Sequence, residues 1–109
     1  MTVRELCDTL GLIAHALPRP ERKITGVYIG DLLSWVMGRA KEGDVWITIM
    51  SNQNCIAVAT LSDAAAILLA EGVIPDAALI ELSESKGVNL LSSSLPAYET
   101  AVRLSELAI

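Results

Sequence analysis

The sequence has few of the side chains from which metal and nucleophilic sites are built. Its 109 residues include one histidine, two cysteines and no phenylalanine, and aromatic residues make up only 4%. Cys7 and Cys55 lie far apart, and together with His15 they do not match the ligand spacings of a zinc site. We therefore expect no metal and no cofactor. Both cysteines are expected to be small buried hydrophobic residues in a reducing cytoplasm.

Positive charge and long apolar runs are also scarce. Lys and Arg number 8 against 13 Asp and Glu, so the formal net charge at pH 7 is −5. This balance gives no attraction to phosphate backbones or anionic lipids, and we expect neither nucleic-acid nor membrane binding. The longest apolar run, Ala64–Ala70, is far shorter than the roughly 20 residues of a membrane span. The N-terminal residues lack the apolar core of a signal peptide, so a soluble cytoplasmic protein is expected.

Apolar residues, by contrast, are abundant. They make up 52% of the chain, and the mean hydropathy is +0.49. A domain of this size leaves much of its surface uncovered, so part of the apolar surface is expected to be buried against another chain. The composition predicts a homo-oligomer, most simply a two-fold dimer.

The first third of the sequence predicts a helix followed by a strand. Thr2 and Glu5 have the spacing of a capping box, and apolar residues then recur every three or four positions through Leu17. The polar, proline-containing stretch Pro18–Lys23 ends this helix. Ile24–Ile29 is rich in β-branched and aromatic residues and is expected to be a strand.

A second helix and strand follow. Asp31 is expected to cap a helix that runs through about Lys41, and Val45–Met50 gives the clearest strand signal of the chain. The two tryptophans, Trp35 and Trp46, are expected to be core or interface residues. The predicted core face of this helix consists of Leu32, Leu33, Trp35, Val36 and Met37.

The segment Cys55–Leu61 allows two interpretations. It could be a strand that pairs with Val45–Met50 through a hairpin turn at Ser51–Asn54, or a buried helix capped by Ser51 or Asn52. In the second case Ala65–Ala70 becomes the next strand. The helix is favoured because it preserves the alternation of helices and strands along the chain.

The last third continues that alternation. Pro75 and Asp76 open a helix that runs through Lys86 and is ended by Gly87, and Val88–Leu91 is a strand. Leu95 and Pro96 introduce a last helix through about Leu107. Residues 1–109 are therefore expected to form a single α/β domain, with an N-terminal helix over 1–17 and a core over 24–109. Its sheet is mostly parallel, with four or more strands and helices on both faces.

A parallel sheet would gather polar turns at its carboxyl edge, where open α/β sheets bind ligands. Hydroxyl and amide side chains beside helix N-termini can bind a small polar ligand, although capping and turn formation explain the same residues. Gly30, Glu71 and Ser94 lie in the same turns, and the acidic Asp31 and Glu71 favour a neutral or weakly anionic ligand over a phosphate. The candidate ligand-binding residues are Asp31, Ser51, Asn52, Gln53, Asn54, Gly72, Ser92 and Ser93.

Motifs of phosphoryl transfer and dinucleotide binding are absent. No Gly-x-x-x-x-Gly-Lys-Ser/Thr sequence occurs. His15, expected on the first helix, has no carboxylate at helical spacing, which favours a solvent-facing or hydrogen-bonded histidine over a catalytic base. The one basic cluster, Arg19, Arg22 and Lys23, is expected in a solvated connector. We therefore expect no catalytic residues and no enzymatic activity.

Four segments resemble the DRTGG domain family: Gly43–Thr48, Asn54–Ala59, Ala66–Gly72 and Gly87–Ser93. The resemblance extends from Gly26 to the C-terminus and is strongest to small stand-alone members that occur beside iron-only hydrogenase genes. It implies a fold related to the N-terminal domain of HPr kinase/phosphorylase. The pentapeptide that names the family is absent, and Ser51-Asn52-Gln53 stands where many members carry Gly-Asp-Arg.

The resemblance implies a regulatory or ligand-sensing role. We expect a non-catalytic module that acts through oligomerisation or a protein partner. The alternative is an enzyme or an accessory subunit with a site shared between chains, tied to hydrogenase or redox metabolism. In a third interpretation the domain serves only as an assembly interface.

Overall fold

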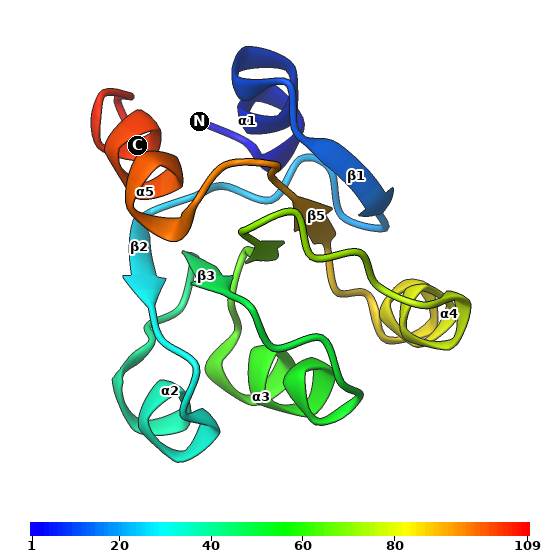
Figure 1. The fold of residues 1–109 in the computed structure, drawn as a ribbon. Helices are drawn as coiled ribbons and strands as arrows, with labels where there is room; N and C mark the ends of the chain where they lie inside the picture. Colours follow the sequence, from blue (N-terminus) through cyan, green and yellow to red (C-terminus); the bar gives the residue numbers. More distant parts are fainter.

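Helices and strands alternate along the chain except at the first two strands, which follow one another, and the computed structural model describes all residues from 1 to 109 (Figure 1). None of the helices is long and apolar enough to cross a membrane. In chain order the elements are α1 (Val3–Leu10), β1 (Ile13–Ala16), β2 (Gly26–Ile29), α2 (Leu33–Arg39), β3 (Asp44–Thr48), α3 (Asn54–Ser62), β4 (Ala66–Leu69), α4 (Ala77–Lys86), β5 (Leu90–Ser92) and α5 (Ala97–Ser105).

The five strands form one sheet in the order β1-β5-β4-β3-β2. The strands β2, β3, β4 and β5 are parallel to their neighbours, whereas β1 pairs with β5 in the antiparallel direction. The predicted mostly parallel α/β sheet is therefore confirmed. The segment after β3 is the helix α3, so the hairpin alternative is wrong.

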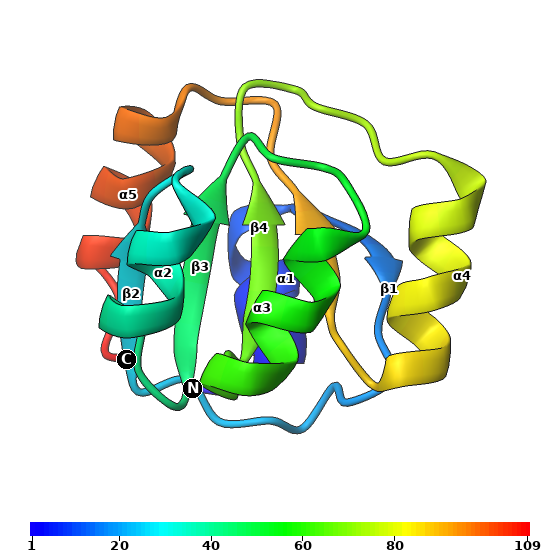
Figure 2. The ribbon, with the colours of Figure 1, turned by 90° about the horizontal axis from the view of Figure 1, so that it is seen from below.

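Each face of the sheet is covered by its own set of helices. α1 and α5 cover one face, and α2, α3 and α4 cover the other (Figure 1, Figure 2). Side chains alternate along β3 between the two cores: Val45 and Ile47 pack with α1 and α5, and Trp46 packs with the opposite helices. β3 and β4 are buried on both faces, as expected for central parallel strands.

The first helix is shorter than its sequence pattern predicts. The capping box at Thr2 and Glu5 is confirmed, but α1 ends at Leu10 rather than at residue 17. Gly11 has φ 65°, a left-handed conformation that glycine adopts readily, and its N–H caps the carbonyl of Cys7. The remaining apolar residues of the predicted helix form β1. The three- to four-residue spacing of apolar residues therefore runs through both α1 and β1 and does not mark the end of the helix.

The second helix also differs from its prediction. α2 begins at Leu33 without a side-chain cap, and the Oδ1 atom of Asp31 instead accepts hydrogen bonds from Thr48 and Ile49 of the neighbouring strand end. Of the predicted core face, Val36 is buried and Leu33 half-buried. Three of its members are exposed instead: Leu32, Trp35 and Met37. A seven-residue helix at the end of a sheet has too little covering structure to bury a wide apolar face.

The two tryptophans have opposite environments. Trp46 is fully buried and its Nε1–H donates to the carbonyl of Gly30 at 2.8 Å, while Trp35 is 53% exposed and stacks under the Arg39 guanidinium. We expect Trp46→Phe to lower the free energy of unfolding by about 2 kcal/mol or more, because it shrinks a packed side chain and removes that donor. Trp35→Phe should change it by less than about 0.5 kcal/mol. Urea unfolding of both variants measures the difference, and equal effects would contradict the assignment.

His15 lies on β1 and not on a helix. Its Nε2 atom is 2.8 Å from the hydroxyl oxygen of Ser92 on β5. Burial lowers the pKa of His15 below the ordinary value of 6.5 because it disfavours the charged ring. The imidazole is thus neutral at pH 7 in the folded protein.

This lowered pKa predicts a loss of stability in mild acid. The unfolded chain takes up a proton as the pH falls through 6.5, while folded His15 resists protonation, so the free energy of unfolding falls with pH in that window. We expect His15→Gln to abolish this part of the pH dependence. His15 is the single histidine of the chain, so urea unfolding at pH 7.5 and 5.5 isolates its contribution. A variant with the same pH dependence as the parent would refute the prediction.

Candidate functional site

The four parallel strands end at one edge of the sheet, as the sequence predicts. Figure 2 shows the loops that follow β3 and β4 together at the upper edge. This carboxyl edge carries the turn at Asp31, the loop 49–53, the turn at Glu71 and Gly72, and the serines after β5. The candidate residues therefore share one edge. Hydrogen bonds join two groups of them to neighbouring strand ends, and the loop before α3 lies between these groups in the sequence.

The first group joins the ends of β2 and β3. Asp31 Oδ1 accepts from Thr48 Oγ1 at 2.8 Å and from the Ile49 N–H at 3.1 Å. Thr48 Oγ1 in turn accepts from the Met50 N–H. The carboxylate therefore fixes the path of the chain where it leaves β3, and Asp31 itself remains exposed.

The loop before α3 carries the exposed amides. Asn52 Oδ1 accepts from the Asn54 N–H at 3.0 Å and from the Cys55 thiol, so Asn52 organises the first turn of α3. Asn52, Gln53 and Asn54 are exposed, and Ser51 is half-buried. The amide nitrogen of Asn52 and the side chain of Asn54 make no hydrogen bond within the chain and can face a ligand.

The second group joins β4 and β5 to α5. Glu71 Oε2 accepts from the Ala97 N–H at 2.8 Å, and the Gly72 N–H donates to the carbonyl of Ser93. Ser93 is buried and its hydroxyl oxygen accepts from the Leu95 N–H. Ser92 is also buried, against His15. Both serine hydroxyls are thus engaged inside the fold.

No activated nucleophile is present at this edge. Burial is the main cause that raises the pKa of both Cys7 and Cys55, and the nearby Asp31 raises that of Cys55 further, so both remain thiols. The Ser92 and His15 pair joins residues 77 positions apart on neighbouring strands, and no sequence signal could have revealed it. Ser92 is buried and lines none of the surface hollows.

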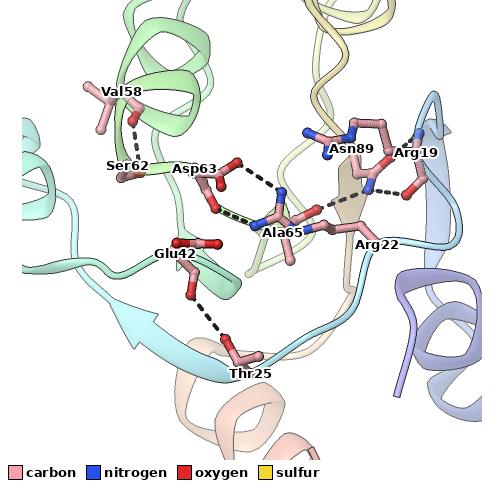
Figure 3. Close-up of polar contacts among 9 residues, drawn as sticks. All are labelled: Arg19, Arg22, Thr25, Glu42, Val58, Ser62, Asp63, Ala65 and Asn89. Carbon is pink, nitrogen blue, oxygen red and sulfur yellow. Dashed lines mark hydrogen bonds and ion pairs between the residues drawn. The ribbon is translucent and has the colours of Figure 1, made fainter.

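Another set of polar contacts lies at the opposite, amino edge of the sheet (Figure 3). Both terminal nitrogens of Arg22 donate to Asp63, one to the carboxylate at 2.8 Å and one to the carbonyl at 3.0 Å. This hydrogen bonding raises the pKa of Arg22 and lowers that of Asp63. Nearby, the Asn89 amide donates to the carbonyls of Arg19 and Ala65. The basic connector is therefore tied to the core, although the sequence predicts a solvated segment.

These contacts frame a hollow that is lined only by polar residues and Gly43. Arg19 and Lys23 are exposed on its rim, but Glu42 and Asp63 offset their charge. At the carboxyl edge, Gln53 is the one candidate residue that lines a hollow, an apolar groove between α3 and α4. The structure holds no group of three or more His, Cys, Asp and Glu side chains that could bind a metal ion.

Known structures share this fold. The regulatory region of Clostridium perfringens pyrophosphatase, comprising CBS and DRTGG domains in complex with the activator diadenosine tetraphosphate, superposes with a TM-score of 0.73. The sequence identity is 19%, and the match covers 94% of this chain but 45% of that chain, so this chain corresponds to less than half of that structure. No curated protein matches the chain.

A family model agrees with the structural comparison. The model of the DRTGG domain matches residues 13–107, from the first strand to the end of the last helix. The match includes β1, whereas the sequence pattern predicts an α/β core that begins at residue 24. The chain belongs to the DRTGG domain family.

Proposed function

We propose that this chain is a non-catalytic regulatory module that binds a small ligand and acts through a second copy of itself or a protein partner. The observation that carries the proposal is the fold: the similar DRTGG domain lies in the regulatory region of a pyrophosphatase, in a structure with a bound activator. The side chains support the non-catalytic part of the proposal, because both thiols are buried with raised pKa values and the one histidine contacts a buried serine.

The proposed ligand site is the exposed loop before α3. The side-chain nitrogen of Asn52 and the side-chain amide of Asn54 make no hydrogen bond within the chain. Ser51 and Gln53 lie in the same loop, and Asp31 and Gly72 lie on other turns of this edge. Ser92 and Ser93 are buried at the end of β5, where their hydroxyl groups are engaged within the fold. Two carboxylates, Asp31 and Glu71, lie on this edge, so a neutral polar or weakly anionic molecule fits it better than a phosphate.

Thermal unfolding with a ligand panel tests this proposal. The panel contains nucleotides, dinucleoside polyphosphates, phosphorylated metabolites and small acids. A ligand present at 100 times its Kd stabilises the folded state by about 2.7 kcal/mol. We expect the double variant Asn52→Ala and Asn54→Ala to lose this ligand-induced stabilisation. The loss of the hydrogen bond between Asn52 Oδ1 and the Asn54 N–H lowers the basal stability by about 0.5–1.5 kcal/mol. The ligand-induced shift, and not the absolute Tm, is therefore compared.

The matched control is Thr9→Ala, an exposed position on α1 at the other face of the sheet. It should keep the full ligand-induced shift. If a ligand from the panel stabilises the double variant as strongly as the parent, the amides of this loop are caps only and the site lies elsewhere.

The second part of the proposal is a homodimer. Eleven large apolar side chains are exposed in the single chain, which is the kind of surface that a second subunit covers. We expect sedimentation equilibrium at micromolar concentration to give twice the 11.6 kDa mass of the chain. A single species of 11.6 kDa would exclude the dimer while leaving ligand binding untouched.

A further inference from the structure

An apolar groove runs between α3 and α4, which lie on the same face of the sheet (Figure 1, Figure 2). Its volume is 310 Å³, which falls in the range of about 300–1,000 Å³ that small-molecule pockets occupy. The buried Ile56 and the half-buried Leu82 line it, together with Leu61, which is 71% exposed. The other lining residues are Gln53, Ala57, Thr60 and Lys86.

Two cations without partners lie at the amino-edge end of this groove. Lys86, the last residue of α4, lines both the groove and a smaller hollow of 70 Å³ that Arg19 also lines. The Cδ atom of Arg19 lies 3.8 Å from the position that a Cβ on Gly87 would take, so the Arg19 side chain lies beside the end of α4. Neither the Lys86 ammonium nor the Arg19 guanidinium forms an ion pair or a hydrogen bond within the chain.

The negative charge at this end is already engaged. No carboxylate lines the groove, and the one in the smaller hollow, Asp63, is held by both terminal nitrogens of Arg22. The last carbonyls of α3 and α4 accept hydrogen bonds from the N–H groups of Asp63 and Gly87. Two full positive charges outweigh the roughly half charge that each helix end carries. This end of the groove therefore attracts an anion.

The size of the groove favours a small molecule over a second copy of the chain. Of the eleven large apolar side chains that are exposed, Leu61 alone lines it. A stable protein interface buries about 800 Å² on each partner. One exposed leucine and the neighbouring Ala57 supply only a small part of such an area, whereas an apolar chain of a few carbons fits along them.

We propose that the groove between α3 and α4 binds a small amphipathic anion, a molecule with an apolar tail and an acidic head group. The tail packs against Ile56, Leu61 and Leu82. The head group, a carboxylate or a phosphate, binds Lys86 and Arg19. Burial of the tail supplies most of the affinity, and the two cations fix its direction in the groove.

Octanoate is the probe, and backbone amide NMR of the whole chain is the measurement. We expect octanoate to shift the amide signals of α3 and α4 with a Kd on the order of 1 mM, as suits so small a ligand. Butyrate has the head group without the tail, and 1-octanol has the tail without the charge. Both should bind at least fivefold more weakly. Octyl phosphate, compared with octanoate, shows which head group the cations prefer.

Four substitutions at exposed positions dissect the two ends of the ligand. Lys86→Gln should raise the Kd for octanoate at least threefold and leave that for 1-octanol unchanged, while Lys41→Gln, at the same edge of the sheet, changes neither. Leu61→Ala should raise the Kd for both molecules at least threefold. Its control is Ile74→Ala, because Ile74 is 79% exposed and lines no hollow.

Three results would overturn this assignment. Octanoate at millimolar concentration shifts no amide of the groove, its shifts gather at other exposed apolar residues such as Trp35, or Lys86→Gln and Lys41→Gln act alike. A fourth result, in which Leu61→Ala weakens a dimer and leaves octanoate binding unchanged, would assign the groove to a second copy instead.

The groove is separate from the loop amides of the proposed function, and one variant distinguishes the two sites. The double variant Asn52→Ala and Asn54→Ala should bind octanoate as the parent does, although it loses the stabilisation by a ligand of the loop. Loss of octanoate binding in this variant would contradict the groove assignment. A failure of octanoate in the parent leaves the loop site to be decided by its own ligand panel.

Discussion

β3 and β4 are buried on both faces, so every backbone group of these strands has to find its partner inside the sheet. Each therefore needs a strand on either side, and the parallel neighbours β2 and β5 complete the set. Parallel neighbours require crossover helices, which must cover both faces to keep the side chains of Trp46 and Ile47 from water. The layers of the molecule follow from this one requirement.

Because the four strands are parallel, their carboxyl ends lie together at one end of the sheet and their amino ends at the other. At the carboxyl edge, Asp31 and Glu71 each bind backbone N–H groups of a neighbouring turn, so the loops hold one another in place. At the amino edge, the Arg22 and Asp63 pair holds the long connector against the end of α3 (Figure 3). Most polar side chains at strand ends thus stabilise the fold. The exposed loop before α3 differs, because the side-chain nitrogen of Asn52 and the side-chain amide of Asn54 make no hydrogen bond within the chain.

Capping residues and glycines in the sequence predicted helix ends correctly where a single residue decides where the helix begins or ends. Asp76 caps the start of α4 and Gly87 ends it, as predicted. The predicted strand over 65–70 is the buried strand β4. The pattern of the first segment was ambiguous in a way that periodicity cannot resolve. Leu10, Ile13 and Leu17 continue a helical stripe, yet Gly11 takes a left-handed conformation that ends α1, and β1 begins two residues later. The strand that follows pairs with β5, more than 70 positions away, and the local spacing of apolar residues carries no information about such a long-range pairing.

The sequence by itself determined the α/β class, the parallel direction of β2, β3, β4 and β5 and the gathering of the candidate residues at one edge, because caps, breakers and apolar runs act over a few residues. The tertiary structure alone decided which of those side chains are free. Ser92 is engaged by His15, 77 positions away, and Asp31 by the end of a different strand. It also decided that the apolar face of α2 stays exposed, since α2 flanks the edge strand and no further element packs beyond it. Such facts depend on which distant segments meet, and packing over the whole chain sets them.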